Sequence, residues 1–185
     1  MMLTWLGADS PRLEGARVMI GDRKLRATGA LVASADEDGP AFSATYSVAT
    51  GETGVVSRVS VRAVDAVGER QVQLHRSEEG IWLVDHGAGA ERTDFEGAAD
   101  VDVGYCVLFN ALPVRRLGLL HTPATHELPM VRVRLPELSV HLVRQTYRST
   151  PDSRVVTFTQ GDFTADLTLD DNGMVLDYPG LAKRI

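Results

Sequence analysis

Apolar and polar residues alternate one by one along most of this chain. The apolar positions are Val59, Val61 and Ala63 in one run, and the odd positions of residues 131–135 and 163–169 in two others. Successive side chains of a β-strand point to opposite faces, so the pattern predicts strands with one apolar face and one polar face. Antiparallel sheets with one buried face commonly have such strands.

Short polar turns separate the alternating runs. Residues 36–40, Glu78–Gly80 and Asp171–Gly173 each lie between two of them. The pair Asn172-Gly173 is a strong hairpin signal, because both residues tolerate positive φ. Closely spaced strands joined by tight turns are typical of a meandering sheet or a barrel.

One segment, about Asn110–Leu120, does not alternate and predicts a helix. We expect the side-chain oxygen of Asn110 to cap it, and Pro113 to be tolerated in its first turn, where a missing N–H costs little. The segment holds too many leucines and valines for a surface helix, so most of its circumference should be buried. A single apolar helix in a strand-rich chain implies a sheet wrapped around it.

Composition narrows the class of protein. A chain of 185 residues suits one domain, here residues 1–185. The net charge of −6 argues against a nucleic-acid partner, which would need cationic side chains to displace counterions. The amino terminus lacks the features of a signal peptide, and no stretch approaches the roughly 18 apolar residues of a membrane helix. We therefore expect a cytoplasmic protein without integral membrane contact.

The motifs of this chain resemble those of a bacterial family of putative glycolipid-binding proteins, formerly a domain of unknown function. The strongest match is Asp100-Val101-Asp102-Val103 followed by Asn110–Leu117, and the carboxy-terminal run from Gly161 to Arg184 also matches. Further matches are Trp5, Trp82 and Gln145–Tyr147. Phe109 and Ala111 depart from the family, which has threonine at these places, so the resemblance implies no hydroxyl role there.

The resemblance implies a mainly β fold, a spiral β-roll in which a long antiparallel sheet coils around the single helix. It implies non-catalytic binding of a lipid or glycolipid in a cleft between sheet and helix, no cofactor, and often a homodimer. The alternative is a cavity-free dimeric interaction module with no small-molecule ligand. A third alternative, a hydrolase-type enzyme, has no catalytic pattern in its favour.

The charged candidates have two interpretations. Arg115 or Arg116 could bind a phosphate or sugar head group through a planar guanidinium. Alternatively both could tie the helix to the carboxylates Asp100, Asp102 or Asp166, because an unpaired buried charge is costly. We favour the ion pairs, and expect no metal site, since no further oxygen ligands converge on the aspartates.

The remaining ligand candidates are Asn110, Trp82 and Tyr147. The two aromatic side chains could line a lipid groove or brace a sugar ring, although aromatic residues in a small β-domain more often fill the core. Cys106, the single cysteine, excludes an intramolecular disulfide, and we expect a packed core thiol rather than a nucleophile.

Overall fold

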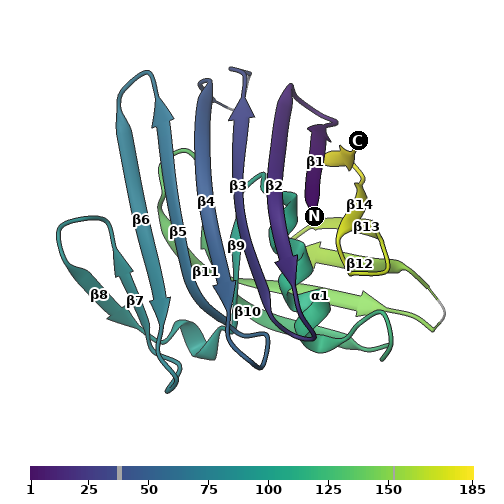
Figure 1. The fold of residues 1–185 in the computed structure, drawn as a ribbon. Coiled ribbons are helices and arrows are strands. Elements are labelled where there is room, and N and C mark those ends of the chain that lie inside the picture. The colour runs from purple at the N-terminus through teal and green to yellow at the C-terminus, as the bar shows by residue number, and fades with distance from the viewer. Residues whose placement is uncertain (37–38, 152) are drawn as a thin grey trace.

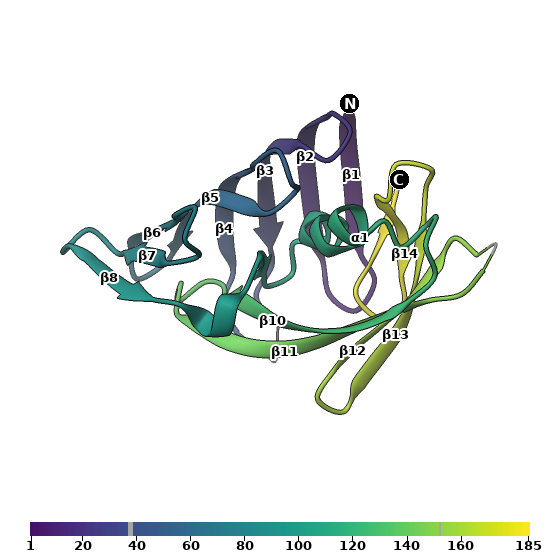
Figure 2. The ribbon, with the colours of Figure 1, turned by 90° about the horizontal axis from the view of Figure 1, so that it is seen from below.

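In the computed structural model, the strands of the chain form one continuous sheet in the order β8-β7-β6-β5-β4-β3-β2-β1-β15-β14-β13-β12-β11-β10-β9 (Figure 1). The structure describes residues 1–36, 39–151 and 153–185, so the turn predicted at 36–40 lies partly outside the described residues. The sheet bends back on itself, and the helix lies between its two arms (Figure 2). The predicted mainly β fold, coiled around one helix, is confirmed.

The first arm is an antiparallel meander, in which each strand pairs with its neighbour in sequence. Val59, Val61 and Ala63 are buried here, as their alternation predicts. The strands of this arm are β1 (Met2–Gly7), β2 (Arg12–Ile20), β3 (Leu25–Ala33), β4 (Phe42–Thr50), β5 (Val56–Asp65), β6 (Glu69–Arg76), β7 (Trp82–Asp85) and β8 (Ala90–Thr93).

The second arm begins after the short 3-10 helix η1 (Phe95–Gly97) and returns to the first arm at its end. The last strand pairs with the first, with Trp5 opposite Arg184, so the two ends of the chain join the arms. The strands of this arm are β9 (Asp100–Val103), β10 (Thr125–Val133), β11 (Val140–Ser149), β12 (Val155–Gln160), β13 (Phe163–Leu169), β14 (Val175–Tyr178) and β15 (Ala182–Arg184).

One strand pair departs from the expected antiparallel sheet. β9 runs parallel to β10, with Asp100 opposite Met130 and Asp102 opposite Arg132. Parallel neighbours need a long crossover connection, and the helical segment supplies it here. The sheet is therefore mixed, because the chain leaves β9, forms the helix and comes back in the same direction.

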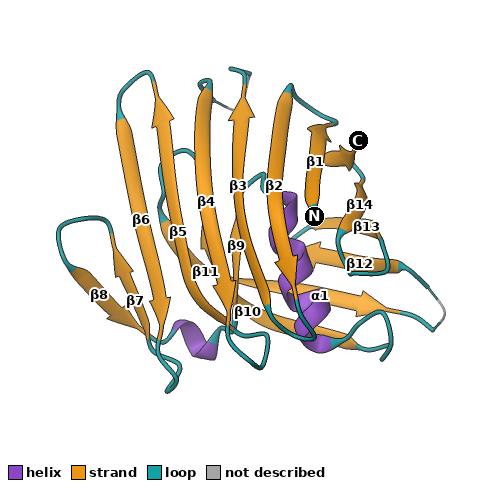
Figure 3. Cartoon of the chain, in the orientation of Figure 1, coloured by secondary structure: helices purple, strands orange, loops and turns teal. Residues whose placement is uncertain are grey.

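The helical segment consists of the 3-10 turn η2 (Val107–Asn110) and the α-helix α1 (Ala111–Leu117) (Figure 3). It ends at Gly118, whose φ of 64° suits a residue without a Cβ. The predicted cap is wrong: Asn110 has helical φ and ψ and makes no side-chain cap bond, because the turn η2 already precedes it. None of the described helices is long and apolar enough to span a membrane.

The interior is packed around this helix, as its composition predicts. Ala111, Leu112 and Val114 are at most 2% exposed and belong to one apolar core with both arms of the sheet. Phe109, just before α1, meets the ring of Tyr46 from β4 edge-on at 5.1 Å. The helix thus fills the space between the arms along its apolar length.

Candidate ligand-binding site

The carboxylate of Asp100 holds the helix to β9. Arg116 donates to it from both Nε and Nη2, and the Nη2–Oδ2 distance is 2.6 Å. Burial raises the pKa of Asp100, and the bond with Arg116 partly offsets this effect. The predicted ion pair is confirmed for these two residues. Asp166, also expected to pair with the helix, instead accepts a hydrogen bond from the Thr157 hydroxyl at 2.7 Å.

Arg115 points to the loops beyond the helix rather than to a carboxylate. Its guanidinium donates to the backbone carbonyl oxygens of Gly21, Asp22 and Asn172, at 2.7–3.2 Å. The expected ion pair is wrong for this residue, because loop carbonyls already surround it. A head-group role for Arg115 or Arg116 stays a prediction, but both guanidinium groups bond within the protein.

Asp102 lies on the same face of β9 and begins a polar network of its own. Arg132 and Gln145 donate to its Oδ2 at 2.7 and 2.9 Å, and both also donate to Oε1 of Gln160, at 3.1 and 2.8 Å. The partner of Asp102 is thus Arg132 on the neighbouring strand, not an arginine of the helix. Burial raises the pKa of this aspartate, against the opposing effects of Arg132 and Gln145.

Two predicted ligand residues extend this network towards the helix. The Tyr147 hydroxyl lies 3.1 Å from Oε1 of Gln145 and 3.2 Å from Oδ1 of Asn110. The hydroxyl has one proton, so it donates to only one of these two acceptors at any moment. Tyr147 is only 2% exposed. The buried tyrosine therefore holds the polar side chains of the network in place from the protein interior. Asn110, by contrast, lies at the surface that these polar side chains form.

That surface is the floor of a cleft of about 310 Å³. Asp102, Asn110, Arg132 and Gln160 line it from the polar side. Cleft volumes of roughly 300–1,000 Å³ are typical of small-molecule sites, so this one suits a compact ligand group. The two arms of the sheet and the start of the helix meet here, which explains why residues far apart in sequence share one site.

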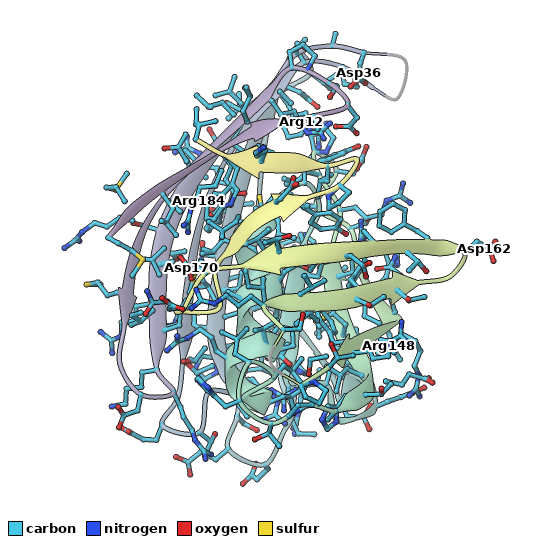
Figure 4. All side chains as sticks on the ribbon, turned by 90° about the vertical axis from the view of Figure 1, so that its right-hand side faces the viewer. Arg12, Asp36, Arg148, Asp162, Asp170 and Arg184 are labelled. Carbon is cyan, nitrogen blue, oxygen red and sulfur yellow. The ribbon has the colours of Figure 1, made fainter. Side chains whose placement is uncertain are left out.

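Three aromatic rings form a further part of the cleft lining, here called the aromatic wall. Phe158, Phe163 and Tyr178, from β12, β13 and β14, meet pairwise with ring centroids 6.0–6.2 Å apart. Phe163 was expected on a buried strand face but is 48% exposed. It lies at the start of β13, next to the projecting β12–β13 turn whose tip Asp162 marks in Figure 4. Its ring therefore forms an open rim of the cleft.

Arg12 from β2 organises the rim on the other side (Figure 4). Its guanidinium forms an ion pair with Asp9, bonds the carbonyl oxygen of Leu181 at 3.4 Å and lies 4.6 Å from the ring centre of Tyr105. All three of these contacts line the cleft. A cation over an aromatic face is favourable when partly desolvated, so a buried arginine can fix this rim.

A buried carboxylate holds the start of the helical segment beside the cleft. Glu14 accepts hydrogen bonds from the Tyr46 hydroxyl at 2.5 Å and from the backbone N–H of Val107 at 2.6 Å. Burial raises the pKa of Glu14 to about 7. The adjacent Cys106 is 2% exposed, and burial raises the pKa of its thiol well above the usual value. The geometry agrees with a packed, protonated thiol.

Trp82 lies away from the cleft. It is fully buried in the first arm, where its indole N–H donates to the carbonyl of Ala98 at 3.0 Å. The core interpretation of this residue therefore has direct structural support. A ligand role for it stays a prediction without a contact in its favour.

Most residues of the cleft were not singled out by sequence. Arg132 occupies a polar position of an alternating strand, and side chains at such positions ordinarily face solvent. The sequence could have identified Glu14, since it lies on the same face of its strand as the buried Ala16 and Val18. A charge at an apolar position is the pattern that would have drawn attention to it. Gln160 and Tyr178 carried no such signal.

Comparisons with known proteins agree with the fold. The family model described as "Putative glycolipid-binding" matches residues 2–184. A crystal structure of a DUF1089 family protein from Pseudomonas aeruginosa superimposes with a TM-score of 0.76 at 24% identity, covering 93% of this chain and 92% of the other. At that identity the likeness concerns the fold. The search of curated proteins found no match.

Proposed function

The chain belongs to the family described as putative glycolipid-binding, and from this premise we propose that it binds the sugar head group of a glycolipid without catalysis. The cleft floored by Asp102, Arg132 and Gln160 is the proposed site. Asn110 borders this floor, so one residue of the predicted ligand set belongs to it. Arg115 and Arg116 do not line it.

One observation carries the proposal: polar side chains and aromatic rings line the same small cleft side by side, with Gln160 on β12 directly opposite Phe163 on β13 in the strand register. A sugar ring has hydroxyl groups that both donate and accept, and C–H faces that pack on aromatic rings. The floor offers matching groups, since Arg132 is a donor, Asp102 an acceptor and Gln160 both. The wall of Phe158, Phe163 and Tyr178 offers apolar surface to the ring face.

The acyl chain is proposed to stay outside the cleft. The cleft is near the lower end of the usual size range, and the apolar side chains of α1 are already packed against the sheet. Burying a chain beside the helix would require displacing Leu112 or Val114. The proposal therefore places recognition in the head group, near the start of the helix.

The first test is a titration with octyl glucoside, octyl galactoside and octyl mannoside, followed by NMR chemical shifts and calorimetry. The expected result is a shift of the signals of Phe163 and Gln160 with at least one sugar. Phe163→Ala should weaken that binding at least tenfold, since it removes the exposed ring of the wall. Val67→Ala is the matched control, because Val67 is 86% exposed on the β5–β6 turn, away from the cleft.

Three results would contradict the proposal. Binding of a fluorescent fatty acid, with no response to any glycoside, would show that the protein recognises the acyl chain of a lipid rather than its head group. Absence of every ligand, together with no lipid in an organic extract of the purified protein, would favour the interaction module. Release of free sugar from a bound glycoside would instead favour an enzyme.

A further inference from the structure

The first arm has an outer face that is turned away from the helix (Figures 1 and 2). On β1–β5 this face carries no acidic side chain. On these strands the exposed residues alternate with the buried ones, and none of the exposed ones within the sheet is Asp or Glu. The whole chain has 25 acidic and 19 basic residues. The net charge of this face is therefore opposite in sign to the net charge of the whole protein.

Three arginines of this face, Arg17, Arg26 and Arg58, form no ion pair within the described parts of the chain. Two other exposed arginines do have partners: Arg62 pairs with Glu69, and Arg144 with Glu96. The charges of the three are thus not neutralised inside the protein. They remain available to a negatively charged partner.

The strand register places two of these arginines on either side of a small residue. Arg26 on β3 lies opposite Ala49 on β4, which lies opposite Arg58 on β5, and His75 follows on β6. Two strand spacings separate the arginine backbones, about 9.6 Å. They border a groove of about 450 Å³, lined also by Arg17. A phosphate group fits between two guanidinium groups at such a separation, because each can turn towards it.

The same face also exposes apolar side chains in register. Leu6, Leu13 and Val32 are aligned across β1, β2 and β3 and are 46–60% exposed. Met19 lies beside Arg26 and is 49% exposed. A small soluble anion would use only the arginines. A lipid surface can contact both kinds of side chain. Its phosphate groups attract the cationic side chains, and the boundary of its acyl chains accepts the apolar ones.

We propose that this outer face docks on a bilayer that contains anionic phospholipids, with lipid phosphates bound between Arg26 and Arg58. Single-stranded nucleic acid fits less well, because the exposed positions of β1–β5 hold no aromatic side chain for base stacking. The cleft lies on the helix side of this sheet, so docking leaves it uncovered. Docking does not depend on the proposed sugar binding.

The experiment is co-sedimentation of the full chain with vesicles of phosphatidylcholine alone, or of phosphatidylcholine mixed with phosphatidylglycerol. Neither vesicle contains a sugar lipid, so the result is independent of the cleft. Binding is expected only to the anionic vesicles and should fall as ionic strength rises. Arg26→Gln with Arg58→Gln should weaken it on the order of 25-fold, at roughly fivefold for each arginine near a membrane surface.

The matched control is Arg134→Gln with Arg148→Gln, which removes the same charge from two exposed positions of the second arm, one just after β10 and one on β11. Equal weakening by both pairs would overturn the proposal, because net charge rather than this face would then govern binding. Equal binding to both vesicle types would also overturn it. So would a groove that binds inorganic phosphate or an oligonucleotide while the protein ignores anionic vesicles.

Discussion

The carboxylate of Glu14 accepts a hydrogen bond from the backbone N–H of Val107 at 2.6 Å, although 93 positions separate the two residues. The bond satisfies the first free N–H of the helical segment, the task that Asn110 was expected to perform. Glu14 stands on β2, in the first arm of the sheet. The start of the helix is therefore anchored by the sheet around it, and this anchor can gain or lose a proton.

Stability should fall as this carboxyl group ionises. Burial raises the pKa of Glu14 from 4.5 to about 7, so the folded state binds its proton more tightly than the unfolded state. The contribution to the free energy of unfolding is then greatest below pH 4.5 and decreases until about pH 7. The loss is on the order of 3 kcal/mol. Urea unfolding from pH 4 to 8 measures it.

Other carboxyl groups also titrate, so the decisive quantity is a difference between variants. Glu14→Gln cannot ionise and should lack this part of the pH dependence. Tyr46→Phe should raise the pKa of Glu14 further, because the tyrosine hydroxyl donates to the carboxylate and lowers its pKa. Identical pH profiles for Glu14→Gln and the unaltered protein would show that Glu14 does not titrate in this range.

Tyr46 can reach Glu14 only because the neighbouring residue on β3, Gly29, has no side chain. A Cβ atom at Gly29 would lie 2.3 Å from the ring of Tyr46, closer than any real contact. Gly29→Ala should therefore destabilise the fold by about 3 kcal/mol, because the tyrosine must leave a packed site. Gly15→Ala, on the adjacent strand, has no neighbour within 4 Å and should change stability by less than about 0.5 kcal/mol. Thermal unfolding of the two variants compares them, and similar losses would be inconsistent with the clash.

The sequence predicts the architecture well because the fold follows from local patterns. Val59 and Val61 alternate with polar residues and are buried, and the apolar run after Asn110 forms the enclosed helix. The pair Arg116–Asp100 was also foreseeable, since a buried arginine needs a carboxylate. The partners of Arg115 could not be predicted, because they are backbone carbonyl oxygens, which every residue type has.

The cleft is less predictable, because alternation identifies a polar face without saying what covers it. Arg132 and Gln160 occupy polar strand positions, as solvent-exposed residues would, yet the coiling of the sheet brings them together. Phe163 occupies an apolar position and is nevertheless half exposed, since it lies where the sheet leaves the core. Such residues are placed by the curvature of the whole sheet, which a period of two does not encode.

Loss of the Arg116 side chain should cost more stability than loss of an exposed arginine. Arg116→Ala leaves Asp100, 1% exposed, without its cation, and unpairing a buried charge costs about 3–5 kcal/mol. Arg148→Ala removes an exposed side chain and should cost less than about 0.5 kcal/mol. Urea unfolding at neutral pH measures both. If Arg116→Ala were as stable as Arg148→Ala, the ion pair would not hold the helix to β9.

The hydroxyl of Tyr147 should influence ligand binding without touching the ligand. It bonds Gln145, which in turn donates to both Asp102 and Gln160 on the floor of the cleft. Tyr147→Phe leaves a buried acceptor unsatisfied, which costs about 1–3 kcal/mol of stability, and frees the Gln145 amide to turn. The affinity for a bound octyl glycoside should then fall severalfold, as calorimetry of the folded variant would show. Phe109→Leu, in the core beside the same helix, should reduce stability to a similar extent but leave the affinity unchanged. If the two variants bind the glycoside equally well, the network behind the floor does not position the residues of the site.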